Sequence, residues 1–432
     1  MQRKIIALLV VALVVTGIIF LGRGRASRTD DGNHLPADSA SMKTVKPTVR
    51  IFMENSGSMN GFVTINSEFK NALGHLIAKT NGFYEGTKLF FINDAVHHAA
   101  VCDNLNDFVL HLNPQTMQVG NTGSTDINKI FGMILDRTKN DTVSILVSDC
   151  VYDVDNVGNL LSAASSSTTG TFMKAIRQAK EKNSDFAVIL MQCESKFYGY
   201  HYEGNMPMVC NGIRPYYVII MGKKEAVLEL DEHLELENTP TGLPGLTHKF
   251  MISSEDTWDL NHQTARVFTN GFTNALRIQP EHDGLNIRNI ITDHDKLDLT
   301  FSFGLGVQNL FVARDYLLDK NNYEVEPEQY YLEQVTDQAK FTECDFFDHP
   351  ICLQIKTEDK SFAPEVTVRL KNQIPAWVKK CSYNTRMMTL PSQHKSYALY
   401  EMVEGIYGAF YNARDRKNKD LFRLKVKVAN YE

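Results

Sequence analysis

Short runs of apolar residues alternate with amphipathic segments between residues 49 and 221, and this pattern restricts the fold more than any other feature of the sequence. Each run is five or six residues long and largely lacks a polar face, as is typical of strands buried on both sides. Parallel strands covered by helices on both faces are buried in this way. We therefore predict an α/β domain over residues 48–235, with a doubly wound and mostly parallel sheet. The apolar runs are 49–53, 88–92, 142–147, 186–191 and 216–221.

The segments between these runs have the spacing of helices. Residues 67–79, 126–138 and 171–182 each gather apolar side chains on one helical face, which would pack on the sheet. Ser67 stands at the start of the first segment, and serine commonly caps a helix N-terminus. Residues 95–101 follow the second strand closely, so we expect them to pair with it as a hairpin.

The pattern changes after residue 237. Residues 238–245 contain prolines and glycines that mark a break in the chain. Beyond the break, apolar and polar residues alternate, which predicts an antiparallel sheet or sandwich, so we expect a second, β-rich α+β domain over 246–432. A helix rich in Tyr, Leu, Met and Phe is expected over 396–414, packed on this second sheet. The alternating segments include 297–303, 366–370 and 422–428.

The N-terminal 47 residues differ from the rest of the chain. Residues 5–22 are apolar except for Thr16, and basic residues flank them on both sides. Such a run is just long enough for one transmembrane helix. A cleaved signal peptide is the alternative, but its apolar region would be shorter, and arginines occupy the place of its cleavage site. We expect an uncleaved signal-anchor, a flexible linker over 23–47 and an extracytoplasmic body.

Charge and cysteine content argue against two classes of protein. The formal net charge is -6 and no basic stripe with interleaved aromatic residues occurs, so we expect no nucleic-acid partner. The seven cysteines are scattered, and no Cys-x-x-Cys or Cys–His pattern has the spacing of a zinc site. We therefore expect most of the cysteines to be buried thiols and not a disulfide framework.

Oxygen-bearing side chains follow three of the predicted elements in the α/β region. They lie in 54–59 after the first strand, in 123–127 before a helix, and in 148–150 after the central strand. Ligands of a doubly wound sheet bind where the carboxyl ends of the strands meet, so these loops are expected to lie together. They supply two carboxylates and three hydroxyls, from Glu54, Ser56, Ser58, Thr125 and Asp149.

Such a set of oxygen donors suits a hard divalent cation, Mg²⁺ first and Mn²⁺ or Ca²⁺ as alternatives. Ser56 and Ser58 are two residues apart across a turn, so both hydroxyls can face the same ion, and Gly57 between them permits a tight backbone path. Neutral hydroxyls and two acids leave the metal with an unsatisfied position, which a carboxylate from another molecule can fill.

At these residues the chain resembles the von Willebrand factor A (vWA) family. The metal-ion-dependent adhesion site of that family has Asp-x-Ser-x-Ser after the first strand, a loop threonine and an aspartate after the central strand. The resemblance covers about 48–235 and implies a protein-interaction module whose partner completes the metal sphere with an acidic side chain. It assigns the metal to Glu54, Ser56, Ser58, Thr125 and Asp149.

The chain departs from the family pattern in two places. Glu54 stands where the family usually has Asp, and its extra methylene moves the carboxylate about one bond length further into the site. Cys150 stands where Gly is common, and we expect it to be structural because sulfur is too soft to prefer Mg²⁺.

Three other interpretations stay open at this point. Taken singly, the serines, Thr125 and Asp149 could be turn residues or helix caps. A metal-dependent phosphatase or hydrolase with Ser56 or Ser58 as nucleophile is one functional alternative, although no histidine follows in the three loops. A scaffold that binds no metal, such as a partner of an AAA+ ATPase assembly, is the other. We identify no convincing catalytic constellation and do not expect an enzyme.

Overall fold

The predicted anchor over 5–22, almost all of the predicted linker and Thr125 lie outside the residues that the structure describes. Within the described part of the chain, no helix has the length and apolarity needed to cross a membrane. The computed structural model describes residues 47–84, 86–99, 105–123, 126–139, 141–152, 160–203, 206–237, 241–254, 256–268, 279–280, 286–290, 299–337, 351–358, 363–385, 394–411 and 420–430.

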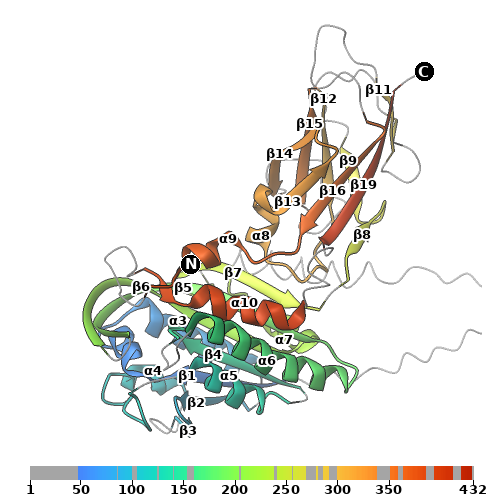
Figure 1. The fold of residues 1–432 in the computed structure, drawn as a ribbon. Coiled ribbons are helices and arrows are strands. Elements are labelled where there is room, and N and C mark those ends of the chain that lie inside the picture. Colours follow the sequence, from blue (N-terminus) through green and yellow to red (C-terminus); the bar gives the residue numbers. More distant parts are fainter. Residues whose placement is uncertain are drawn as a thin grey trace, which may run out of the picture. The chain divides into compact units, whose positions relative to one another are not determined.

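A mixed sheet organises the first part of the chain (Figure 1). Its seven strands, among the described residues, have the order β3-β2-β1-β4-β6-β5-β7. β1 lies between β2 and β4 and runs parallel to both, so the strand order reverses at β1. The loops after β1 and β4 therefore meet at one edge of the sheet. The strands are β1 (Thr48–Glu54), β2 (Lys88–Ile92), β3 (Val96–His98), β4 (Thr142–Ser148), β5 (Phe186–Glu203), β6 (Met206–Lys223) and β7 (Leu246–Ser253).

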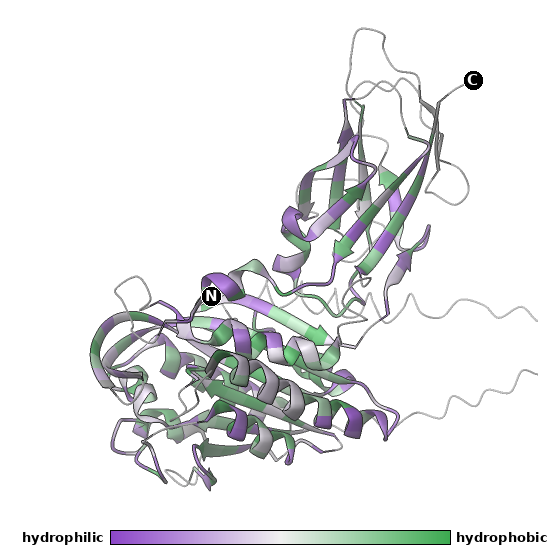
Figure 2. Ribbon diagram, in the orientation of Figure 1, coloured by the Kyte–Doolittle hydropathy of each residue, from purple (hydrophilic) through white to green (hydrophobic). Residues whose placement is uncertain are grey.

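Helices cover both faces of this sheet, as the apolar strands predict. Successive residues of β1 and β4 point to opposite faces and enter two separate hydrophobic cores, and Figure 2 shows these strands as largely hydrophobic. Ser67 caps α3 by accepting a hydrogen bond from the Lys70 amide, as predicted. One core contains α2 (Asn60–Val63), α3 (Glu68–Phe83), α4 (Leu105–His111) and α7 (Lys224–Leu234), after the 3-10 turn η1 (Gly57–Met59); the other contains α5 (Ile127–Leu135) and α6 (Leu160–Lys180).

The prediction of a mostly parallel sheet is wrong for its second half. β6 pairs antiparallel with both β4 and β5, and β7 pairs antiparallel with β5. The physical reason is the length of the connection: β5 ends at Glu203 and β6 begins at Met206, whereas a parallel pair needs a crossover of about a dozen residues. β5 and β6 thus form one long hairpin that continues beyond the end of β4, and we name residues 194–203 with 206–216 the hairpin arm.

Two elements from the predicted second domain belong to the α/β part of the fold. β7 is an edge strand of the seven-stranded sheet among the described residues. The predicted helix over 396–414 is α10 (Leu399–Phe410), and it packs on α6 in the second core and not on the β-rich sheet as expected. Its buried aliphatic and aromatic face suits either surface, which is why periodicity alone selects the wrong one. α9 (Ala376–Lys380) and the short pair β17 (Ser382–Tyr383) and β18 (Ser396–Tyr397) join the same core.

The remaining β-rich region is built from two mainly antiparallel sheets around a third core, which agrees with the predicted sheet or sandwich. One sheet has the order β10-β11-β19-β16-β13 with β8 beside β19, and the other has the order β14-β15-β12-β9. These elements are β8 (Trp258–Leu260), β9 (Ala265–Phe268), β10 (Gln279–Pro280), β11 (Asn286–Ile290), β12 (Leu299–Leu305), α8 (Arg314–Leu318), η3 (Lys320–Asn322), β13 (Tyr323–Glu326), β14 (Tyr330–Asp337), β15 (Ile351–Thr357), β16 (Glu365–Lys371) and β19 (Asp420–Asn430).

Candidate metal centre

The loop after β1 is held in place by backbone-directed hydrogen bonds. The Asn55 side-chain amide donates to the carbonyls of Met117 and Val119, at 2.9 and 2.7 Å. The Gly57 amide donates to the Thr122 carbonyl at 2.9 Å. The first loop is thereby fixed against the segment that leads to Thr125, the predicted ligand outside the described residues.

Three of the five predicted ligands come together. The hydroxyls of Ser56 and Ser58 lie 3.1 Å apart, and both side chains are buried. Asp149, which follows β4, is buried beside them, and a hydrogen bond from Ser58 is among the effects that lower its pKa. One carboxylate oxygen of Asp149 accepts a hydrogen bond from the Val151 amide at 3.2 Å. The other, Oδ2, is buried with no hydrogen-bond partner.

Burial dominates the electrostatics of Asp149. Its removal from water raises the pKa of the carboxyl above the ordinary value, and the attraction of the Arg214 guanidinium and the Ser58 hydrogen bond offset part of that rise. The backbone around Asp149 is also fixed from the C-terminal part of the chain, since the Ser396 hydroxyl donates to the Asp149 carbonyl at 2.8 Å.

Glu54 reaches across the end of β4. The Ser148 hydroxyl donates to Glu54 Oε2 and itself accepts a hydrogen bond from the Cys150 amide at 2.8 Å. The longer side chain of Glu54 therefore has a defined anchor on the neighbouring strand.

Cys150 has a structural explanation. Its φ is 52°, in the left-handed region that favours glycine. The side chain is buried, and desolvation raises the pKa of the thiol well above its usual value. Burial therefore keeps the side chain as a neutral thiol.

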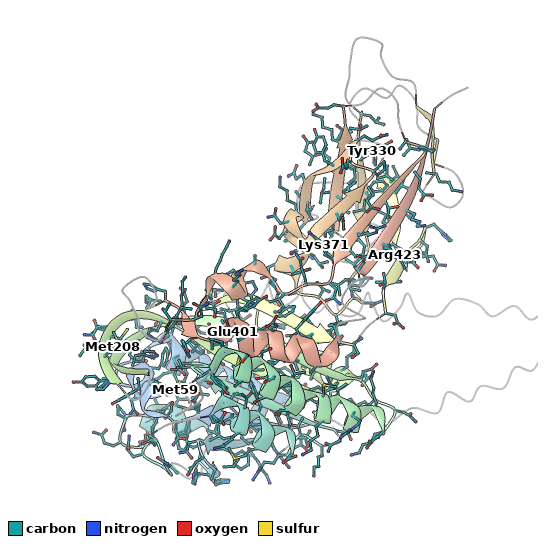
Figure 3. The ribbon with its side chains drawn as sticks, in the orientation of Figure 1. Met59, Met208, Tyr330, Lys371, Glu401 and Arg423 are labelled. Atoms are coloured by element: carbon teal, nitrogen blue, oxygen red, sulfur yellow. The ribbon has the colours of Figure 1, made fainter. Side chains whose placement is uncertain are left out.

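The hairpin arm lies over the loop after β1. An added Cβ on Gly57 would be 3.1 Å from Tyr202 Cε2, and the backbones of Gly61 and Gly199 approach closely enough that a Cβ on Gly199 would be 3.0 Å from the Gly61 Cα. Figure 3 labels Met59 in the covered loop and Met208 on the arm. The arm therefore forms one wall of the candidate site.

The arm contributes two buried residues, Arg214 and His201, that sequence analysis missed. Both come from a stretch that is not continuously apolar, so no apolar run marks it as a buried strand. The signal that could have found Arg214 is a single basic residue two positions before the apolar run 216–221.

The residues present fit a divalent oxygen-ligated metal. The two serine hydroxyls are adjacent, and one buried oxygen of the Asp149 carboxylate has no hydrogen-bond partner, so that oxygen is available to a cation. Among the described residues, no group of three or more His, Cys, Asp or Glu side chains could hold a metal ion.

No family model, curated protein or solved structure matches the chain. The resemblance to the vWA family therefore stays a prediction from the motif.

His201 makes the fold sensitive to acid. Burial, with a further contribution from Arg214, lowers the pKa of His201 to about 3 from the ordinary 6.5, and its Nε2 lies 3.4 Å from the Tyr383 hydroxyl. In the unfolded chain His201 is protonated below about pH 6.5, whereas in the folded chain it is protonated only below about pH 3. Stability should therefore fall as the pH drops through this window, by about 1.4 kcal/mol per pH unit.

Chemical denaturation at pH 7.5, 6 and 5 measures this effect. In His201→Gln the dependence on pH should be weaker by that amount, because glutamine does not titrate. His98→Gln on the exposed part of β3 is the matched control and should keep the full dependence. An unchanged slope in His201→Gln contradicts the assignment.

Proposed function

We propose that this protein is a protein-interaction module of the vWA type that binds its partner through a divalent cation, tethered to a membrane by residues 5–22. The observation that carries the proposal is the cluster of Ser56, Ser58 and Asp149, with the serine hydroxyls 3.1 Å apart and one buried oxygen of Asp149 without a partner. Hydroxyl and carboxylate oxygens are the donors that Mg²⁺ and Mn²⁺ prefer.

In the proposal, the two serine hydroxyls hold the cation directly, Asp149 and Glu54 balance its charge, and Thr125 supplies a further hydroxyl by the resemblance. The bound cation attracts a carboxylate of the partner to its open position. Neighbouring groups hold the proposed ligands of the cation in place. Asn55 fixes the loop after β1, Ser148 positions Glu54 and Ser396 positions the Asp149 backbone.

The outer face of the hairpin arm supports a protein as the partner. Tyr198, Tyr200 and Val209 are exposed there by 48%, 53% and 65%, and Tyr200 is paired with Val209 across the two strands. Tyrosine is enriched at surfaces where proteins bind one another. A partner whose acidic side chain reaches the metal could also contact this face.

Metal binding tests the proposal directly. The full chain in detergent should bind Mn²⁺, as followed by electron paramagnetic resonance, and Asp149→Asn should weaken this binding at least about tenfold because a charged donor is lost. The matched control is Asp136→Asn, an exposed carboxylate that pairs with Lys174 and should have no effect. Absence of Mn²⁺ binding to the unaltered protein at millimolar concentration overturns the proposal.

A further inference from the structure

A charged guanidinium is buried in the wall of the candidate site. Arg214, on β6, is 0% exposed and is one of the largest fully buried side chains among the described residues. Removal of a permanent charge from water is costly unless an opposite charge and hydrogen bonds compensate it. Arginine keeps its proton at any ordinary pH, so this positive charge is always present.

Strand register places Arg214 over the loop after β4. Ser148, the last residue of β4, is paired with Tyr217 of β6, and Arg214 comes three residues earlier on that antiparallel strand. It therefore lies past the carboxyl end of β4, where Asp149 follows. Arg214 shares a face with Val218, which is paired with Val147 and packs in the same core.

The arm holds the guanidinium from its other sides. The Arg214 Cζ lies 5.4 Å from the centroid of the Phe197 ring, and Nη1 lies 3.9 Å from Cys210 Sγ. An aromatic ring face attracts a cation but does not neutralise it. Arg214 and Asp149 carry opposite charges at this end of the sheet and attract one another.

We propose that Arg214 is a built-in cation of the site, which balances the Asp149 carboxylate when no metal is bound and limits how tightly a divalent ion binds. The second half rests on the proposed function. With two carboxylates, the guanidinium and a divalent ion, the loaded site has a surplus of one positive charge. That surplus favours an anionic group on the partner.

Arg214→Met tests this role because methionine fills similar space without charge. In the full chain in detergent, Arg214→Met should bind Mn²⁺ at least about tenfold more tightly than the unaltered protein, since two carboxylates are then left for the metal alone. EDTA should lower its Tm more than that of the unaltered protein. Arg214→Lys keeps a positive charge while the lysine is protonated, and in that state its Mn²⁺ affinity should stay within about threefold of the original.

The outcomes separate the two proposals. Unchanged or weaker Mn²⁺ binding by folded Arg214→Met overturns the role of Arg214, while binding by the unaltered protein upholds the proposed function. Tight binding by Arg214→Met alone supports the role of Arg214 and contradicts metal use by the natural chain.

The double variant Arg214→Met/Asp149→Asn decides if Arg214→Met does not fold or if no form binds Mn²⁺. A double variant with a higher stability than Arg214→Met supports charge balance between Arg214 and Asp149. An equal or lower stability of the double variant overturns it.

Discussion

Replacement of Gly405 by alanine should destabilise the protein by about 2–3 kcal/mol, although alanine is the better helix former. Gly405 lies in α10 where this helix packs on α6. An added Cβ would be 2.5 Å from the Ser165 carbonyl oxygen and 2.7 Å from the Thr168 Cβ. These atoms belong to, or are attached directly to, the backbone of α6, so no side chain can rotate away and the helices must separate.

Gly170→Ala is the matched control for this prediction. Gly170 lies in the interior of α6, and an added Cβ there meets nothing within 4 Å. It should therefore stabilise the protein by about 0.5–1 kcal/mol through helix propensity. Urea denaturation measures both variants. Equal, stabilising effects of the two substitutions contradict the packing of α10 on α6.

That packing shows where prediction from sequence reaches its limit. Apolar periodicity identifies α10 as a helix with one buried face, but it carries no information about which surface that face contacts. Contacts between residues far apart in the chain decide this, and Ser165 and Gly405 are separated by 240 residues. The hydrogen bond between Thr169 Oγ1 and the Gly405 carbonyl, at 3.1 Å, joins the same two helices.

The strands illustrate the same distinction. Buried runs such as 142–147 are identified correctly because apolar residues on both faces leave few alternatives. Their direction depends on the connections between them. The short connection between Glu203 and Met206 dictates the antiparallel pair, and it becomes visible only when the polar arm is included in both strands.

The candidate site is predictable in so far as its residues follow strand ends. Ser56, Ser58 and Asp149 are brought together because β1 and β4 are parallel neighbours. The sequence shows only that each of the three residues follows an apolar run. The contact of Glu54 with Ser148 and the position of Arg214 depend on side-chain length and on the hairpin arm. Those features require the folded structure.

The close approach of the arm to α2, which follows the loop after β1, leads to the second large effect. Gly61→Ala should destabilise the protein by about 3 kcal/mol, because an added Cβ would lie 2.5 Å from Phe197 Cε1. Phe197 has little freedom to move, since it is fully buried and packs edge-on against Phe62 with ring centroids 4.9 Å apart. Thermal and urea denaturation of the full chain measure the loss.

A compensating substitution makes this prediction specific. Phe197→Leu removes the ring that the new methyl group would strike, so Gly61→Ala should cost clearly less in a Phe197→Leu background than in the natural one. Gly132→Ala in α5, where an added Cβ meets nothing within 4 Å, serves as the control and should be neutral or stabilising. If Gly61→Ala costs the same with Phe197 or Leu at position 197, the arm does not lie on the loop after β1 and on α2, and Arg214 loses its place beside Asp149.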